Sequence, residues 1–490
     1  MCEAADSKDV KKPSLALSLV PLAFLVLALV VNVILFKDDA TYGPNQLALL
    51  LSGMLTLALG SLILKVPYKK MEDRIVNSIS LATQACLILL VVGSLISVWI
   101  LSGIVPTMIY YGLNIINPDY FLPVACVSCA FVAISTGSSW STSGTVGVAL
   151  IGIGQTLGVP MGMTAGAIIS GAYFGDKMSP LSDTTNLAPA MAGTDLFTHI
   201  RHMVYTSGPA ILIAIVLFFF IGLGYGGGQS DPVKIKTVLD LIVTQFNIGI
   251  HLFLVPIIVL VMVAKKMPAF PAMIIGVLLG VVAALIFQQP LLSKLAGDSS
   301  GLSGIYSQIV SVAHGGFSFE SGNAAMDKLF NRGGMSGMLT TVWLILMAMV
   351  FGGALEATGM LQKIAQSILS LVSGTASLIG SVVGTCLVMN MTASDQYLAI
   401  VVPGKMFRKS FDDFDLHPKN LSRALEDSGT VTSVLVPWNS GGAYHSKVFG
   451  VGTLEYLPFC FFNLLSPVIS IFLASMNWTI EKKIKEASAV

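Results

Sequence analysis

Charged side chains are scarce in this sequence. Asp, Glu, Lys and Arg together make up 11% of its 490 residues, while hydrophobic residues make up 54%. Because ordinary soluble domains carry about 25% charged residues, this scarcity excludes a chain built around one soluble core. The formal net charge of +1 gives no argument for a nucleic-acid-binding surface, and we expect no nucleic-acid partner.

Motifs for nucleotide binding and catalysis are also missing. The glycine-rich segment "GIGQTLG" at 152–158 follows no predicted strand and contains no lysine, so it does not fit a phosphate-binding loop. Without a convincing hydrolase or metal motif, we expect neither an enzyme nor an ATP-driven transporter, and no cofactor or nucleotide. Cys126 and Cys129 form a C-x-x-C pair, but its apolar surroundings favour buried packing.

Long apolar runs dominate what is present. A helix of about 20 apolar residues crosses a hydrocarbon core of about 30 Å, and eight runs come close to or exceed this length. The first has no small-residue cleavage site behind it, so we interpret it as a retained helix and not as a signal peptide. The sequence therefore predicts an all-α polytopic membrane protein. Plain spans are predicted at 14–36, 46–66, 76–103, 203–226, 239–263, 268–288, 337–358 and 454–476.

Four further apolar segments are interrupted by polar residues. In the first and third, two arms of about 16 residues flank a polar tip; neither arm is long enough to cross the membrane fully, so we predict two re-entrant hairpins. In the second and fourth, Pro180 and Pro437 remove a helix donor, which predicts two broken helices. The hairpins are predicted at about 119–157 and 374–407, and the broken helices at about 162–191 and 422–450.

The same order of segments occurs twice. Three plain spans, a hairpin, a broken helix and a last span fill 14–226, and the series recurs in 239–476. Each half makes five crossings because a hairpin returns to its own side. The second half is therefore predicted to be inverted relative to the first, a common plan of secondary transporters. We expect tails at 1–13 and 477–490 and an outer linker at 227–238.

The distribution of positive charge supports this topology. With the N-terminus inside, 19 of the 27 Lys and Arg residues fall in predicted inner segments and 7 in outer ones, in agreement with the positive-inside rule. Both termini are therefore predicted to be cytoplasmic. The Gly- and Ser-rich stretch 289–335 is expected to form a long outer loop, and Lys177 lies within the membrane.

Three aspartates lie in the interrupted segments. An ionised Asp at the bilayer centre costs roughly 2.5–3.5 kcal/mol, so Asp176, Asp183 and Asp395 together cost on the order of 8–10 kcal/mol if unpaired. We hypothesise a hydrated pocket in which Asp183 and Asp395 bind Na⁺ or H⁺ competitively, because desolvation raises the pKa of a carboxyl group towards neutrality. A structural role is the open alternative for all three, and for Asp176 it is a helix cap or a pair with Lys177 or a backbone amide.

Oxygen atoms around the breaks complete the predicted site. A broken helix frees backbone carbonyls that coordinate cations and amides that meet anions. Na⁺ is expected at Asp183, Thr184, Asn186 and Asp395, and Thr392 supplies a further oxygen. The supporting residues at the polar tips and breaks are Ser138, Ser141, Thr142, Ser182, Thr185, Ser394, Asn439 and Ser440.

Three segments carry a family resemblance. They are "GAYFGDKMSPLSDTTNLAP" at 171–189, "MTASDQYLAIVVPGKMF" at 391–407 and "LEDSGTVTSVLVPWNSGGA" at 425–443. Together with the order of spans they resemble the NhaC family of sodium/proton antiporters, within the ion transporter superfamily. The resemblance implies Na⁺/H⁺ exchange in a bacterial plasma membrane, and by superfamily analogy a homodimer with a scaffold part and a moving part. The cation- and proton-binding residues that it implies are Asp176, Asp183, Thr184, Asn186, Thr392 and Asp395.

A second function remains open beside cation exchange. Relatives in this family exchange malate for lactate with coupled Na⁺ and H⁺, and the hydroxyl-rich tips offer hydrogen bonds to a carboxylate. The absence of an arginine at the predicted midplane weighs against such a carrier of a small organic solute. A channel is disfavoured because it does not need two inverted halves.

Overall fold

The computed structural model describes residues 11–36, 40, 42–226, 232–296, 301–318, 327 and 330–483. Within these ranges the chain is helical and contains no β-strand, apart from one isolated bridge between Leu416 and Lys482. This confirms the predicted all-α class. Of the predicted tails and linker, residues 1–10, 227–231 and 484–490 lie outside the described residues.

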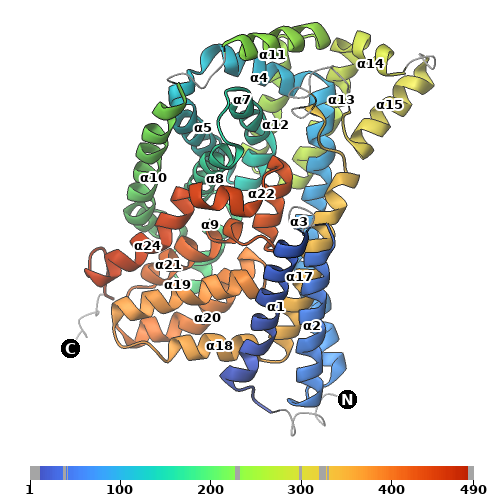
Figure 1. Cartoon of the computed structure of the whole chain (residues 1–490). Helices are drawn as coiled ribbons and strands as arrows, with labels where there is room; N and C mark the ends of the chain where they lie inside the picture. Colours follow the sequence, from blue (N-terminus) through green and yellow to red (C-terminus); the bar gives the residue numbers. More distant parts are fainter. Residues whose placement is uncertain are drawn as a thin grey trace.

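Six of the eight predicted plain spans are single long helices. They are α1 (Leu15–Phe36), α2 (Pro44–Leu62), α3 (Tyr68–Leu101), α10 (Leu196–Gly226), α13 (Ala269–Phe287) and α17 (Leu339–Ala357). In the described chain, eight helices are long and apolar enough to cross a membrane, or up to ten if each of two bent pairs is one span. In Figure 1, α1, α2, α3 and α17 stand together along one side of the molecule.

The predicted span 239–263 is not the plain helix that we expected. It bends by 87°, and the bend is held by Gln288. The side chain of Gln288 accepts a hydrogen bond from the Asn247 N–H at 3.0 Å and donates one to the Asn247 carbonyl at 2.8 Å. The first piece consequently lies across the upper end of the molecule (Figure 1). The pieces are α11 (Pro232–Gln245), the 3-10 turn η4 (Ile250–Phe253) and α12 (Leu254–Ala264).

The predicted span 454–476 is also bent, by 56°. Pro458 lies just before this bend, and because proline lacks an N–H it cannot continue the hydrogen-bond ladder of a helix. A short helix and a 3-10 turn therefore precede the long helix. The elements are α23 (Thr453–Tyr456), η9 (Leu457–Phe459) and α24 (Phe461–Ser475).

The stretch 289–335, expected as a long loop, contains two helices in its described part. They lead to Gly334, whose N–H donates to the carbonyl of Gly93 in α3 at 2.7 Å, so this stretch is attached to the long helices. The two helices are α14 (Gln289–Ala296) and α15 (Leu302–Gly315); the remaining short elements are α4 (Ile104–Ile115), η6 (Ser336–Met338) and α18 (Met360–Leu369).

Each of the four interrupted segments contains a helix break at its polar residues. The first comprises η2 (Pro118–Tyr120), α5 (Phe121–Thr136), α6 (Ser139–Thr142), the π turn η3 (Ser143–Gly147) and α7 (Val148–Thr156). The second comprises α8 (Met161–Met178) and α9 (Asp183–Ala192), so its break falls where Pro180 predicts it. The third comprises α19 (Thr375–Thr392) and α20 (Gln396–Asp413). The fourth comprises α21 (Pro418–Leu425), the π turn η7 (Glu426–Thr430), η8 (Ser433–Leu435) and α22 (Ser440–Phe449).

Small residues bring the first two interrupted segments into close contact. A Cβ atom at Gly171 of α8 would lie 2.0 Å from the carbonyl oxygen of Cys126 in α5, so only glycine fits there. Gly154 of α7 lies against Thr164 at the start of α8, and Gly147 lies against Ile168 further along it. The first segment therefore folds back on itself beside α8. Its re-entry into a membrane, and the inversion of the second half, stay predictions.

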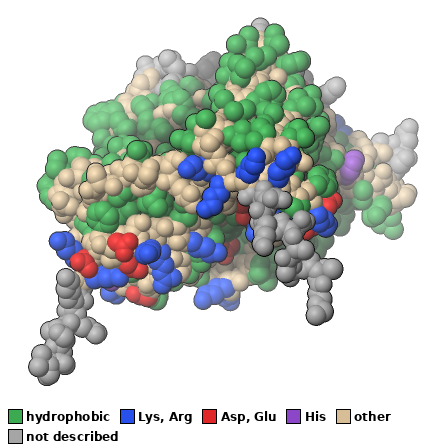
Figure 2. Space-filling model, turned by 90° about the horizontal axis from the view of Figure 1, so that it is seen from below, with side chains coloured by type: hydrophobic (Ala, Val, Ile, Leu, Met, Phe, Trp, Pro, Cys, Tyr) green, Lys and Arg blue, Asp and Glu red, His purple; other side chains and the backbone are tan. Residues whose placement is uncertain are grey.

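Lys and Arg side chains gather at one end of the molecule. Helix α1 begins at the lower end of the molecule in Figure 1, and Figure 2 shows this end from below with many blue side chains among fewer red ones. Such a face is typical of the cytoplasmic side of a membrane protein. The predicted orientation, with both termini inside, is compatible with this arrangement.

Candidate functional site

A cavity of about 620 Å³ lies where the four helix breaks meet. Each break supplies part of its wall: Ser138 at the first, Asp183 at the second, Asp395 at the third and Ser440 at the fourth. These residues cap or begin α6, α9, α20 and α22, so the N-terminal ends of four helices face one space. The rest of the wall includes α3 and the turn between α12 and α13, where Lys266 stands.

Asp183 is the most accessible of the three predicted aspartates. It is the first residue of α9, its side chain is exposed to the cavity, and it forms no hydrogen bond within the described chain. The penalty expected for an aspartate in hydrocarbon does not apply to it, because polar residues that line a cavity escape the lipid. Asp183 therefore presents an unshared carboxylate to an entering cation.

Asp176 lines the cavity. It also has the structural role that the sequence left open, because it binds a backbone amide. One of its oxygens, Oδ2, accepts hydrogen bonds from the Ser139 N–H at 3.1 Å and from the Ser139 hydroxyl at 2.7 Å. Asp176 thus fastens the end of α8 to the start of α6, and it is buried. Its carboxylate also interacts with the Ser182 hydroxyl, and the residue lines the cavity.

At the third break, Asp395 also uses a carboxylate oxygen to bind backbone amides at the start of a helix. As the N-cap of α20, its Oδ1 accepts hydrogen bonds from the Tyr397 N–H at 2.9 Å and the Leu398 N–H at 3.0 Å. The carboxylate is 2% exposed and lines the cavity. Only one of its oxygens, Oδ1, caps the helix. The helix cap explains why an aspartate occupies this break. The same side chain also lines the cavity.

The polar residues of the first broken helix form hydrogen bonds mainly with backbone groups and with one another at the break. The Ser182 hydroxyl caps α9 and lies 3.1 Å from the Thr184 hydroxyl. The Thr185 hydroxyl donates to the carbonyl of Lys177 at 3.1 Å, and the Asn186 amide donates to the Ser182 carbonyl at 2.7 Å. Ser182, Thr184 and Asn186 line the cavity while Thr185 does not. Several carbonyls at the break, those of Asp176, Lys177 and Ser182 among them, are therefore already hydrogen-bonded, a constraint that the sequence did not reveal.

Five other predicted residues do not line the cavity. The Thr392 hydroxyl donates back to the Val388 carbonyl at 2.7 Å, and Ser394 is buried in a left-handed backbone conformation with φ of 57°. Thr142 binds the carbonyl of Ser138. Ser141 is buried within α6, and Asn439 caps α22 while its amide binds Asn390.

One cavity residue that the sequence interpretation missed is Tyr397. It follows Asp395 by two positions and lines the cavity. It shares the cavity lining with Asp176, Asp183 and Asp395. The only signal in the sequence was its place in "SDQY".

A buried ion pair behind the cavity was also missed. Lys177, next to Asp176, pairs with Asp427 of η7, and both side chains are 0% exposed. The Ser466 hydroxyl of α24 lies 3.0 Å from the Lys177 ammonium. Beside this pair Glu426 is fully buried, and neither of its oxygens has a hydrogen-bond partner in the described chain. Lys177 therefore pairs with an acid 250 positions later and not with Asp176, a pair that was one of the open structural alternatives for that aspartate.

The carboxylates do not converge on a single point in this conformation. Among the described residues, no three His, Cys, Asp or Glu side chains form a group that could hold a metal ion. The described cavity lining contains one cationic side chain, Lys266. The site as it stands is a vestibule of about 620 Å³ with three acidic side chains, wide enough for a hydrated ion or a small solute.

Proteins similar to this chain are antiporters by name. The model of the Na⁺/H⁺ antiporter family matches residues 171–478. The chain is 33% identical to the Na⁺/H⁺ antiporter NhaC of Alkalihalophilus pseudofirmus, over 96% of this chain and 98% of that one. It is 37% identical to the malate-2H⁺/Na⁺-lactate antiporter of Bacillus subtilis, with 95% of each chain covered. It is 33% identical to the arginine/ornithine antiporter ArcD of Halobacterium salinarum, over 98% of this chain and 95% of that one.

Proposed function

This chain belongs to the Na⁺/H⁺ antiporter family, and on that premise we propose that it exchanges Na⁺ for H⁺ across the bacterial plasma membrane by alternating access. The observation that carries the proposal is the cavity at the four breaks, which Asp176, Asp183 and Asp395 all line. Because these carboxylates sit among helix ends away from lipid, a cation or a proton neutralises them in competition.

In this proposal the open vestibule is one end state of transport. It opens beside the turn between α12 and α13, which carries Lys265 and Lys266 on the predicted cytoplasmic side. Closure moves the break of α8 and α9 against that of α19 and α20, so that Asp183 and Asp395 share one Na⁺ with the Thr184 hydroxyl and the Asn186 carbonyl oxygen. A proton on the same carboxylates permits the return.

The predicted architecture supplies the remaining parts of the proposal. The group of α1, α2, α3 and α17 at one side of Figure 1 is suited to a fixed scaffold, and the broken helices are suited to the moving part. We propose that the scaffold sides of two chains form a homodimer in the lipid bilayer.

Reconstitution into liposomes that contain a pH dye tests this function. Added external Na⁺ is expected to raise the internal pH, because entry of Na⁺ expels H⁺. Asp183→Asn and Asp395→Asn are expected to lose this response while inserting and folding normally. Asp240→Asn is the matched control, since Asp240 is exposed on α11 away from the cavity. Full exchange in both Asp183→Asn and Asp395→Asn would refute the assignment.

A second candidate function is exchange of a small organic solute coupled to Na⁺ or H⁺. The cavity of about 620 Å³ falls in the range of roughly 300–1,000 Å³ that is usual for small-molecule sites, and is far larger than one Na⁺ requires. Two relatives are named for organic acids or amino acids. Adding malate, lactate, arginine or ornithine to the same liposomes decides between the two: this candidate requires that protons move only when a solute is present.

A further inference from the structure

A second cavity, of about 410 Å³, lies between the first turns of α10, the start of α21 and the residues that follow α24. One wall is a face of α10 formed by Thr198, Arg201, His202 and Tyr205, which recur at helical spacing. The other wall is Lys419 at the start of α21, together with residues 479–481 that follow α24. This second cavity shares no lining residue with the cavity at the four helix breaks.

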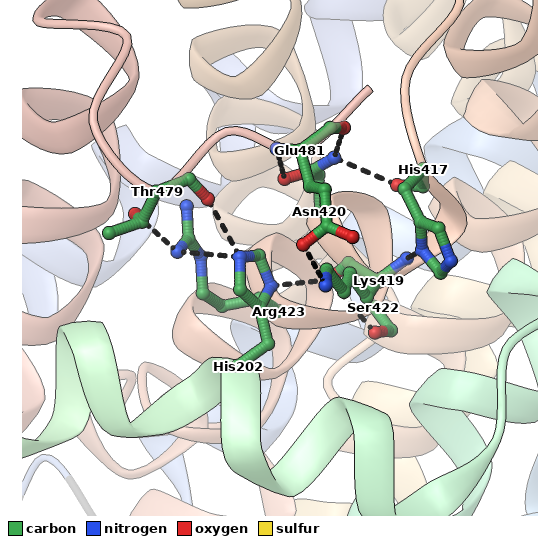
Figure 3. Close-up of polar contacts among 8 residues, drawn as sticks. All are labelled: His202, His417, Lys419, Asn420, Ser422, Arg423, Thr479 and Glu481. Atoms are coloured by element: carbon green, nitrogen blue, oxygen red, sulfur yellow. Dashed lines mark hydrogen bonds and ion pairs between the residues drawn. The ribbon is translucent and has the colours of Figure 1, made fainter. Parts of the chain in front are cut away.

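Hydrogen bonds hold the walls of this second cavity in place. His202 places its two ring nitrogens 3.2 Å from the Lys419 carbonyl and 2.7 Å from the Thr479 carbonyl. The Asn420 amide donates to the Glu481 carbonyl at 2.7 Å. Figure 3 shows His202 rising from α10 towards Arg423 and Thr479, with Asn420 and Glu481 beside them. The cavity is therefore a built site and not a chance gap between loose side chains.

The charge balance of the cavity is positive. Lys419 is paired with Glu481, and that hydrogen bond holds the pKa of Glu481 below its usual value, so this pair is ionised and neutral in sum. Arg201 is exposed on the cavity wall and has no ion pair or hydrogen bond among the described residues. Arg423, behind His202, is fully buried, and its Nε and Nη2 have no hydrogen-bond partner in the described chain.

Apolar surface continues from the cavity along α10. Phe197, Tyr205 and Leu212 are 64%, 53% and 64% exposed on this helix, and Trp478, next to the cavity, is 60% exposed. Exposed aromatic residues beside cations mark the level where lipid headgroups meet acyl chains. An anion bound in this cavity therefore lies next to an exposed apolar surface, which is suited to contact with hydrocarbon chains.

We propose that the cavity between α10, α21 and residues 479–481 binds the phosphate headgroup of an anionic membrane lipid. Arg201 is its principal ligand, because a free guanidinium binds phosphate oxygens with two parallel hydrogen bonds. The acyl chains lie along Tyr205 and Leu212, which follow Arg201 on α10. The buried Arg423 adds positive potential from behind. A membrane lipid is favoured over a soluble phosphate by the apolar strip that continues from the site. The inference does not depend on which ion or solute the other cavity carries.

Lipid titration of the purified full-length protein in detergent tests this site. Phosphatidylglycerol is expected to raise the melting temperature of the wild type in a saturable manner, whereas phosphatidylcholine is not. Arg201→Gln is expected to weaken the apparent affinity for phosphatidylglycerol roughly tenfold, as the loss of a charge-assisted pair of hydrogen bonds requires. Arg201→Lys, which keeps the charge, is expected to weaken it less.

The control variant is Arg408→Gln. Arg408 is likewise an exposed arginine without an ion pair in the described part of the chain, but it lies on α20 outside the cavity; its variant should bind phosphatidylglycerol like the wild type. Equal affinity in Arg201→Gln and wild type, or no response of the wild type to phosphatidylglycerol, overturns the proposal. Inorganic phosphate that displaces the lipid and stabilises the protein through Arg201 equally well would show a soluble-anion site instead.

Discussion

Separating the two charges of the Lys177–Asp427 pair is expected to destabilise the protein strongly. Both side chains are 0% exposed, and Asp427 Oδ1 also accepts hydrogen bonds from the Thr206 hydroxyl at 2.9 Å and the Ser466 hydroxyl at 3.1 Å. Removing one member leaves an uncompensated charge in the interior, which costs about 3–5 kcal/mol. Asp427→Asn and Lys177→Met are each expected to lose that much free energy of unfolding.

The double variant provides the decisive comparison. Replacing a whole buried pair by neutral groups is often nearly neutral, so Lys177→Met with Asp427→Asn is expected to be more stable than either single variant. Unfolding in mixed micelles, followed by tryptophan fluorescence, measures all three. Arg74→Gln serves as the control, because the partly exposed Arg74–Glu356 pair is expected to contribute only about 0–1 kcal/mol. Losses that simply add in the double variant would refute the reasoning.

Three further variants test the packing and the polar groups of the interior. Gly171→Val is expected to push α5 and α8 apart, because a Cβ there meets the Cys126 carbonyl at 2.0 Å, and to lose about 1–3 kcal/mol or more in the same unfolding assay. Gln288→Ala is expected to cost about 2–3 kcal/mol, since two backbone groups of Asn247 lose their partner; unchanged hydrogen exchange at the Asn247 amide would contradict it. Glu426→Gln is expected to melt no lower than the wild type at neutral pH, because a buried unpaired carboxylate is costlier than a neutral amide, and a clear loss of stability would mean that the carboxylate has a partner.

Local chemistry explains which features could be predicted from the sequence. A proline acts on its own helix, so Pro180 placed the break between Met178 and Asp183 without knowledge of anything distant. Span length is likewise local, and six of the eight predicted plain spans are single helices. The aspartates stood out because carboxylates are costly inside a membrane, and all three line the same cavity.

Contacts between distant segments account for what could not be predicted. The 87° bend at Asn247 depends on Gln288, 41 positions later, and the partner of Lys177 is 250 positions away. The direction in which a polar side chain points could not be predicted from the sequence either. The hydroxyl of Thr392 was predicted as an ion ligand, yet it donates to Val388 one turn back, a bond that any helical threonine can form.

The charges around the cavity at the four helix breaks explain why more than one carboxylate lines it. Four helices, α6, α9, α20 and α22, direct N-terminal ends at it, and each such end carries up to about half a positive charge. The C-terminal ends of α5 and α8 lie at the same breaks and carry partial negative charge, so they offset part of this positive field. Asp176 and Asp395 each spend one oxygen on an N-terminal helix end, and so offset the field that the breaks create. Asp183, which caps nothing, adds a third carboxylate, and Lys266 is the one cationic side chain in the described lining. Acidic side chains therefore outnumber basic ones around this space, and such an excess favours a cation or a proton over an anion.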